Sequence, residues 1–507
     1  MNSIYCNADP TLLKLFERAG NLRKVLCAPL DFAKETHAVM FCNGMGDVLK
    51  KAFYVPNSPA GVECLVQELT ATCHHRGIAL KHAFFGGEDT PSYAENFTAQ
   101  LRQRGYLVAR VNAFDAKRQR ENLQASNDEL DLHGIAHCLL KGRARVLAQA
   151  PQLHHQLRLL VRERDFLVHS LTALLNRLHP HVDRLFPGFL NPKLSGIVPH
   201  QPACWWLLSQ RFSAPSLVRR DRTKLIEGLQ KFNITHAEET VDQLQAYAAK
   251  VLPPQKELLP ASQVALERLV EVAQSLQHQI ELLEPEMATL LLQSPGARLT
   301  TIPGLGLALS AGLAAELCVL GAIPPLAKLC SYGGIIPATQ QSGGPDQAPR
   351  QALTFPHCNY RLKSYLLQAG EHMAQVRDTD AWRLRQQAEA ENQHTLRVLG
   401  KHAAGVIRCL LLGERAYLPA RLYDPASSAE DRARYYQQYW PKLMVKWRGL
   451  APLPKVFDPA QPLGRWRQMA QEVYALSLPL SGSSNQKTNK QAKDNHDVTD
   501  PALLEES

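Results

Sequence analysis

Short apolar runs alternate with helical patterns between Lys24 and Ala113. The runs that favour strands lie at residues 24–31, 37–42, 50–55, 79–88 and 106–113. A helical pattern covers residues near 61–73, and a second one separates the last two runs. Strand patterns that alternate with helical patterns predict a mixed α/β domain.

Two later segments carry an apolar residue every three or four positions. The first seam consists of Leu153, Leu157, Leu160, Leu167, Leu171, Leu174 and Leu178, with Arg164 in the missing slot. The second consists of Leu266, Leu269, Ala273, Leu276, Ile280, Leu283, Met287 and Leu290. Such seams predict a long coiled-coil hairpin, or pairing between chains. Pro285 is expected to kink or interrupt the second helix. Residues 188–260 look irregular and then helical, and the pattern assigns them no role.

After Ser294 small apolar residues dominate, and helical patterns resume from Arg361 to about Leu412, which predicts a compact, mainly helical domain. The stretch from Leu305 to Ile323 is apolar enough to suggest a membrane-spanning helix. Glu316 and the many small residues in it favour a packed core helix instead. Residues 481–507 are polar and aperiodic, so they are expected to be disordered.

Composition narrows the class of protein. With 507 residues, of which 45% are hydrophobic, the chain is too long for one core and too apolar for global disorder. The formal net charge of +10 favours a polyanionic partner, either nucleic acid or an anionic membrane surface. The beginning of the chain lacks a signal-peptide pattern, so we expect a cytoplasmic protein. Eleven cysteines without a C-x-x-C pair exclude the common zinc and redox motifs.

Four acidic residues stand where a metal-dependent enzyme would need them. Asp31 and Glu88 each close an apolar, strand-like run, and Asp128 and Asp131 are three apart at an expected helix start, which places both on one face. Because a lone carboxylate in a sheet is costly, Asp31 needs a partner or a metal ion. Four converging carboxylates can hold two Mg²⁺ ions about 4 Å apart for phosphoryl transfer. Any one of these acids taken alone is better explained as an ordinary surface residue, so the spacing by itself does not establish a metal site.

Five sequence segments resemble those of a known family. They are LDFAKETHAV, EDTPSY, NDELDLHGIA, LTTIPGLGLALSAGLAAEL and LCSYGGIIPATQQSGG. The chain is similar in them to insertion-sequence transposases with a DEDD, RuvC-like N-terminal domain, whose relatives include Piv-type DNA invertases. The resemblance implies Asp31, Glu88, Asp128 and Asp131 as catalytic and metal-binding residues, and Ser342 as the catalytic serine. It also implies a two-ion Mg²⁺ site, double-stranded DNA as substrate, a bridge RNA as guide, and a homo-oligomer, dimeric or tetrameric.

The resemblance implies a multidomain α/β plus α architecture. Its parts are a RuvC-like, ribonuclease-H-like catalytic domain (23–146), a coiled-coil region with an inserted helical segment (147–294) and a serine-bearing transposase domain (295–413). Outside the resemblance, the chain divides into an N-terminal extension (1–22), a C-terminal extension (414–480) and a disordered tail (481–507). The sequence departs from the family pattern at Pro91, at Leu132 and at residues 356–359, where PHCN replaces a basic segment. The loop therefore lacks two positive charges that could contact DNA, and Arg361 and Lys363 follow it directly.

The resulting hypothesis is a DNA transposase or recombinase that combines a two-metal carboxylate site with a serine nucleophile. Three alternatives remain open. A RuvC-like nuclease or resolvase would use water and leave no covalent intermediate, and a Piv-type invertase would differ only in the DNA arrangement that it recombines. A nucleic-acid-binding protein with a decayed site would have no reason to retain all four acids and Ser342.

Overall fold

The computed structural model describes most of the chain up to Gly413. The described residues are 9–88, 91–120, 127–146, 151–336, 338–340, 350–352, 358–377, 379–388, 393–413 and 417. They belong to two compact units, residues 1–149 and 150–507. Ser342 lies outside the described residues, as do the predicted disordered tail and, apart from Tyr417, the predicted C-terminal extension.

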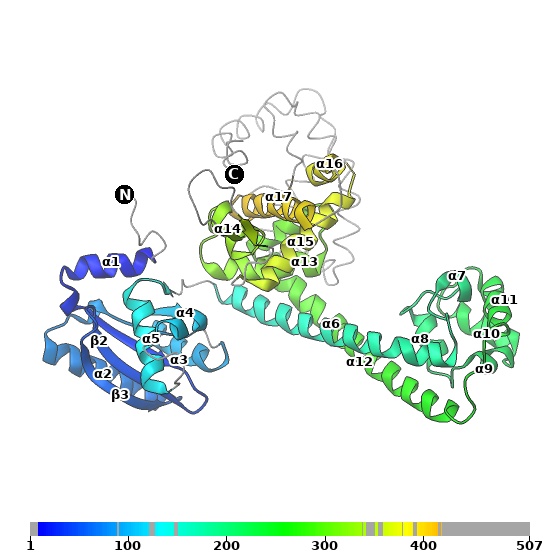
Figure 1. The fold of residues 1–507 in the computed structure, drawn as a ribbon, viewed down its shortest axis with the longest axis horizontal. Helices are drawn as coiled ribbons and strands as arrows, with labels where there is room; N and C mark the ends of the chain where they lie inside the picture. Colours follow the sequence, from blue (N-terminus) through cyan, green and yellow to red (C-terminus); the bar gives the residue numbers. More distant parts are fainter. Residues whose placement is uncertain are drawn as a thin grey trace, which may run out of the picture. The chain divides into compact units, whose positions relative to one another are not determined.

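A six-stranded sheet forms the centre of the N-terminal unit (Figure 1). Its order is β3-β2-β1-β4-β5-β6, with β1 parallel to β4, β4 parallel to β5, and the other neighbours antiparallel. The strands are β1 (Leu26–Asp31), β2 (Thr36–Asn43), β3 (Val48–Pro56), β4 (Ala83–Glu88), β5 (Leu107–Val111) and β6 (Arg145–Val146). Each predicted apolar run therefore contains a strand, and the mixed α/β prediction is confirmed. The arrangement is consistent with a ribonuclease-H-like domain.

Helices cover both faces of this sheet because its strands are apolar on both sides. On one face α2 (Pro59–Arg76) and α3 (Pro91–Gln103) pack against alternate strand residues such as Leu26, Ala28 and Leu30. On the other face lie α1 (Pro10–Ala19), α4 (Ala113–Arg118) and α5 (Asp128–Leu140). Short 3-10 turns, η1 (Leu22–Lys24) and η2 (Leu80–His82), precede β1 and β4. Position 31, five residues after position 26, therefore faces α5.

Two long helices, α6 (Gln152–Leu185) and α12 (Leu259–Gln293), form the stem of the second unit. Leu157 at the start of α6 shares a core with Leu291 at the end of α12, whereas Leu178 and Leu266 share another core at the opposite end. The helices thus run antiparallel, and the second predicted seam is buried or half-buried throughout. Supercoiling of the pair stays a prediction. Pro285 does not interrupt the second helix, because α12 continues through it as far as Gln293. A kink at Pro285 stays a prediction.

A small helical subdomain is formed by the residues that connect α6 to α12 in the sequence. It contains α7 (Pro192–Ser195), α8 (Pro202–Leu208), α9 (Ala214–Val218), α10 (Arg222–Gln230) and α11 (Ala237–Ala248). Phe186, Phe189 and Phe212 lie at its centre, fully or almost fully buried, and their rings contact one another. This core extends onto the facing sides of α6 and α12. The segment that the sequence pattern left without a role therefore folds against the far end of the long helices.

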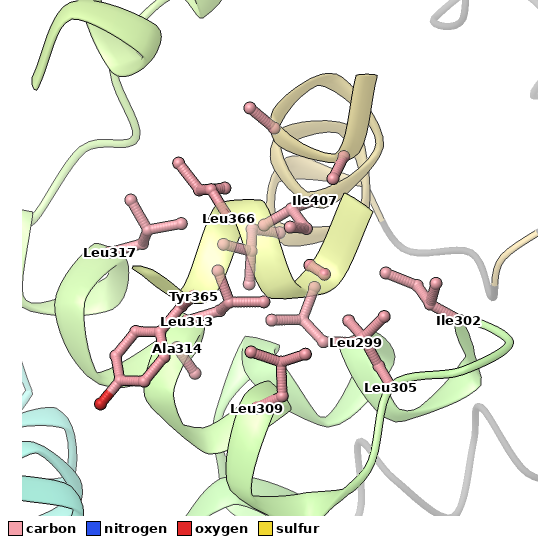
Figure 2. Packing of buried hydrophobic residues seen from close by; sticks show 14 of the residues in the cluster. Leu299, Ile302, Leu305, Leu309, Leu313, Ala314, Leu317, Tyr365, Leu366 and Ile407 are labelled. Carbon is pink, nitrogen blue, oxygen red and sulfur yellow. The ribbon is translucent and has the colours of Figure 1, made fainter. Parts of the chain in front are cut away.

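The opposite end of the long helices carries the mainly helical domain that the sequence predicted. Its elements are η3 (Pro295–Thr301), α13 (Leu307–Leu317), η4 (Cys318–Leu320), α14 (Leu326–Tyr332), β7 (Ala338–Gln340), β8 (Arg350–Ala352), α15 (Tyr360–Gln375), α16 (Asp380–Gln387) and α17 (Gln393–Leu412). Figure 2 shows Leu313 and Leu317 of α13 packed near Leu366 of α15 and Ile407 of α17. Every residue of α13 from Leu309 to Leu317 is buried, which confirms a packed core helix. No helix among the described residues is long and apolar enough to cross a membrane.

Candidate active site

Asp31 and Glu88 lie side by side at the ends of two central parallel strands. Leu30 of β1 is in register with Gly87 of β4, so the next residues, Asp31 and Glu88, are neighbours at the carboxyl edge. Glu88 is two and four residues beyond Gly86 and Phe84, and Phe84 belongs to the core under α5. Both carboxylates therefore face the side that α5 covers.

The start of α5 brings the paired aspartates to the same edge. Gly86 permits this approach, because a Cβ at that position would come within 2.3 Å of the Leu139 side chain of α5. Asn127 caps the helix by accepting a hydrogen bond from the backbone nitrogen of Leu130 at 2.8 Å. Asp128 and Asp131 consequently fall in the first turn, where the helix dipole favours negative charge.

The electrostatics of Asp31 and Glu88 reflect how close the four acids lie. Burial raises the pKa of Asp31, and the charges of Asp131 and Asp128 raise it further. Burial also raises the pKa of Glu88, followed by the charges of Asp31 and Asp131. These pKa shifts indicate that half-buried carboxylates of like charge repel one another. A bound cation would reduce this repulsion.

Two further residues belong to this edge, and the sequence analysis missed both. The Arg120 Nη2 lies 2.6 Å from Asp131 Oδ1, with 11% of the Arg120 side chain exposed, and its charge opposes the raised pKa values of Asp31 and Glu88. The Tyr54 hydroxyl donates to Asp128 Oδ2 at 3.0 Å. Tyr54 lies opposite Ala38, which lies opposite Asp31, so strand alternation could have placed it on this face.

The donor set suits a hard divalent cation, because carboxylate oxygens are the ligands that Mg²⁺ prefers. Asp31, Glu88, Asp128 and Asp131 would be the residues that hold it. Within the parts of the chain that the structure describes, however, no group of three or more acidic, histidine or cysteine side chains is arranged so that it could hold a metal ion. The Arg120 guanidinium lies against Asp131 instead. Metal-bridging distances between the four acids stay a prediction.

We expect Arg120→Gln to destabilise the N-terminal unit in EDTA by about 2 kcal/mol, because it removes the cation from a nearly buried ion pair among like charges. Added Mg²⁺ should restore much of this stability, since it can take over the countercharge. Thermal unfolding with and without Mg²⁺ measures both effects. Lys117→Gln removes the same charge from an exposed position of α4 and serves as the control. An equal loss in both variants would contradict a specific role for Arg120.

The remaining predicted site residue, Ser342, lies in the second unit. It falls outside the described residues, in the connection between β7 and β8. These two strands pair antiparallel, with Ala338 opposite Ala352. The neighbouring described segments, α14 and α15, belong to the helical core around α13.

Comparisons with known proteins match both units. Residues 28–187 match a DEDD transposase family of the IS110 type, and residues 296–386 match the transposase IS116/IS110/IS902 family. The first range contains all four acids, and the second contains Ser342. An uncharacterised 43.6 kDa protein of the insertion element IS110 from Streptomyces coelicolor is 27% identical over 178 residues. That match covers 34% of this chain and 40% of the relative, so the chain spans less than half of the relative's length.

Proposed function

We propose that this chain, which carries two transposase domains of the IS110 type, is a DNA transposase that cuts and rejoins DNA strands when an insertion sequence moves. The observation that carries the proposal is the carboxylate edge formed by Asp31, Glu88 and the first turn of α5, inside a domain that matches DEDD transposases. The net charge of +10 supports DNA as the substrate.

The proposed chemistry consists of two successive phosphoryl transfers, first from DNA to the Ser342 hydroxyl and then from phosphoserine to a DNA hydroxyl. Its hydroxyl attacks the scissile phosphorus, loses its proton, and forms a phosphoserine ester while a strand end leaves with a free hydroxyl. A hydroxyl end then attacks the phosphoserine, which restores the phosphodiester and frees the serine. Because the bond energy is conserved in the ester, rejoining needs no ATP.

The acid cluster supports a two-ion Mg²⁺ site in this reaction. Two bound ions would polarise the scissile phosphate and stabilise the charge of the leaving oxygen. Asp31 and Glu88 would bind them at the strand edge, and Asp128 and Asp131 would complete the set from α5. The raised pKa values of Asp31 and Glu88 support this assignment, because bound cations would favour the charged forms.

The partners follow from the same resemblance. We propose double-stranded DNA of the element ends and target as substrate, a bridge RNA as guide, and a homo-oligomer, dimeric or tetrameric, as the active form. The guide rests on the resemblance alone. In the oligomer, Ser342 of one protomer would complete the carboxylate site of another, which would prevent cutting before the DNA complex has assembled.

We propose that the hairpin of α6 and α12 carries the protomer contacts of this oligomer, and the second seam is the place to test them. Ile280 is 8% exposed and Leu276 is half-buried, so placing aspartate at both positions should cost about 3 kcal/mol each and separate α12 from its neighbours. We expect a lower oligomeric state in light scattering, or loss of helix in circular dichroism. Gln279→Asp, at an exposed position of the same helix, is the control. An unchanged oligomer with intact helices would contradict the proposed protomer contacts.

The proposed function is tested by the products made from element-end DNA. A transposase that uses Ser342 as its nucleophile yields rejoined strands without ATP and a protein–DNA adduct that survives denaturation. A nuclease or resolvase that uses water yields unjoined ends and no adduct, and that outcome would replace the proposal. A Piv-type invertase uses the same chemistry but inverts a segment, which the sizes of the recombinant products reveal.

A further inference from the structure

A fully buried carboxylate lies in the second unit, far along the chain from the acid cluster. Glu316 of α13 has no exposed surface and is bound by two arginines of α6. Arg162 Nη2 lies 3.1 Å from Glu316 Oε1, and Arg158 Nη2 lies 3.3 Å from Oε2. Burial raises the pKa of Glu316, but Arg158, Asn359 and Arg162 outweigh that effect and hold the pKa below its usual value. Glu316 is therefore a charged anchor, whose removal would leave two arginines poorly compensated.

Asn359 connects this anchor to two further segments. Its Nδ2 donates to Glu316 Oε2 at 2.8 Å and to the Tyr332 hydroxyl at 3.0 Å. Its backbone nitrogen donates to the Tyr332 carbonyl at 2.8 Å, and its Oδ1 accepts from the Leu362 backbone nitrogen at 3.1 Å, which caps α15. The side chain thus needs both a donating and an accepting end, a requirement that aspartate would not meet beside Glu316.

The hydrogen bonds of Asn359 to Tyr332 join the two ends of the chain segment 333–358. Tyr332 ends α14, and Asn359 directly precedes α15, so the bonds between them join the two ends of residues 333–358. Gly334, with a φ of +62°, lies against Cys358, and a Cβ there would come within 2.5 Å of the Cys358 Sγ. The paired strands β7 and β8 lie within this segment, and their connection includes Ser342.

We propose that Glu316, Asn359 and Tyr332 form a clamp that positions the serine-bearing segment and fixes it to α6 through Arg158 and Arg162. The inference rests on the proposed role of Ser342. Glu316 and Asn359 are positioning residues, because they act on the DNA only through the segment that they hold. The clamp connects the two ends of this segment, Tyr332 and Asn359, to α6.

The clamp can be tested by reversing its polarity. Asn359→Asp sets two carboxylates against each other and removes the donor. When Asn359→Asp is combined with Glu316→Gln, the new amide at position 316 can donate to the new carboxylate at position 359. That carboxylate can still cap α15, and the total charge of the double variant is that of the wild type. Gln368→Glu adds the same charge as Asn359→Asp at an exposed position of α15 and is the matched control.

Three measurements are made on the full-length proteins: hydrogen exchange of peptides covering 337–357 without DNA, the rate of the Ser342–DNA adduct, and thermal stability. Asn359→Asp should speed exchange at least ~10-fold and slow adduct formation ~100-fold, with DNA affinity nearly unchanged, because misplacing a reacting group costs about that factor. The double variant should regain about tenfold of the lost adduct rate, because positions 316 and 359 again form a donor–acceptor pair. Recovery should stay incomplete, because Arg158 and Arg162 no longer contact the carboxylate of Glu316.

Wild-type exchange and adduct rates in Asn359→Asp would overturn the clamp. The clamp would also be overturned if the double variant did not restore the adduct rate and the adduct rates of all variants followed their thermal stability. If the wild type forms no adduct at all, the proposed function fails, while the exchange measurement still decides whether the clamp holds its segment.

Discussion

Replacing Ser342 by alanine should abolish the covalent protein–DNA adduct and lower strand exchange at least about a thousandfold, because no other group would take the phosphoryl bond. Metal and DNA binding should persist, since the substitution changes neither the carboxylates nor the overall charge. The measurement traps each protein on element-end DNA, denatures the mixture, and separates free protein from adduct.

Ser331→Ala is the control for this experiment, because Ser331 is an exposed residue of α14 in the same domain. It should form the adduct at the wild-type rate. An equal adduct in Ser342→Ala, or strand exchange that survives the substitution, would rule out the serine mechanism and leave the nuclease that uses water.

Asp31→Asn should abolish cleavage and at the same time stabilise the N-terminal unit in EDTA. The folded-state pKa of Asp31 is raised, so the ionised group opposes folding above that pKa. In the wild type, stability should therefore fall as pH rises from the ordinary carboxyl value through the raised one. Asp31→Asn should weaken this dependence, because one carboxylate of the cluster no longer titrates.

Glu129→Ala tests whether the loss of cleavage is specific to the four clustered acids. Glu129 is an exposed acid of the same helical turn, between Asp128 and Asp131, and its loss should leave cleavage unchanged. Full wild-type activity in EDTA, or cleavage by Asp31→Asn, would refute the metal-dependent carboxylate site.

Much of the carboxylate edge formed by Asp31, Glu88 and the first turn of α5 could be predicted from the sequence, because local patterns determine it. Asp31 and Glu88 each follow an apolar run, and runs of that kind form the buried parallel strands of an α/β sheet. The spacing of Asp128 and Asp131 fixes their common face wherever the helix packs. Neither apolar run shows by itself that β1 and β4 are neighbours. Only the folded sheet shows that they pair in parallel.

The clamp could not be predicted, because its partners are far apart in the sequence. The sequence shows Glu316 as the one acid in an apolar stretch, but Arg162 lies 154 residues before it and Asn359 lies 43 residues after it. No periodicity connects such positions. Pro285 shows a different limit, because its local preference is to interrupt a helix, yet α12 continues through it. Met287 and Leu291, which follow it in α12, are buried in the core of the C-terminal helical domain.

The inserted helical subdomain has a consequence for synthesis of the chain. α6 is complete at Leu185, but α12, which covers its apolar seam, ends only at Gln293. At roughly 5–20 residues per second, the seam of a nascent chain stays without that partner for about 5–20 s. The inserted helices are made first and share a core with the end of α6, so they can cover Leu178 and Val182 early. Leu157 and Val161, at the other end, stay exposed for longest, and a nascent chain is most vulnerable there to association with a chaperone or with another nascent copy.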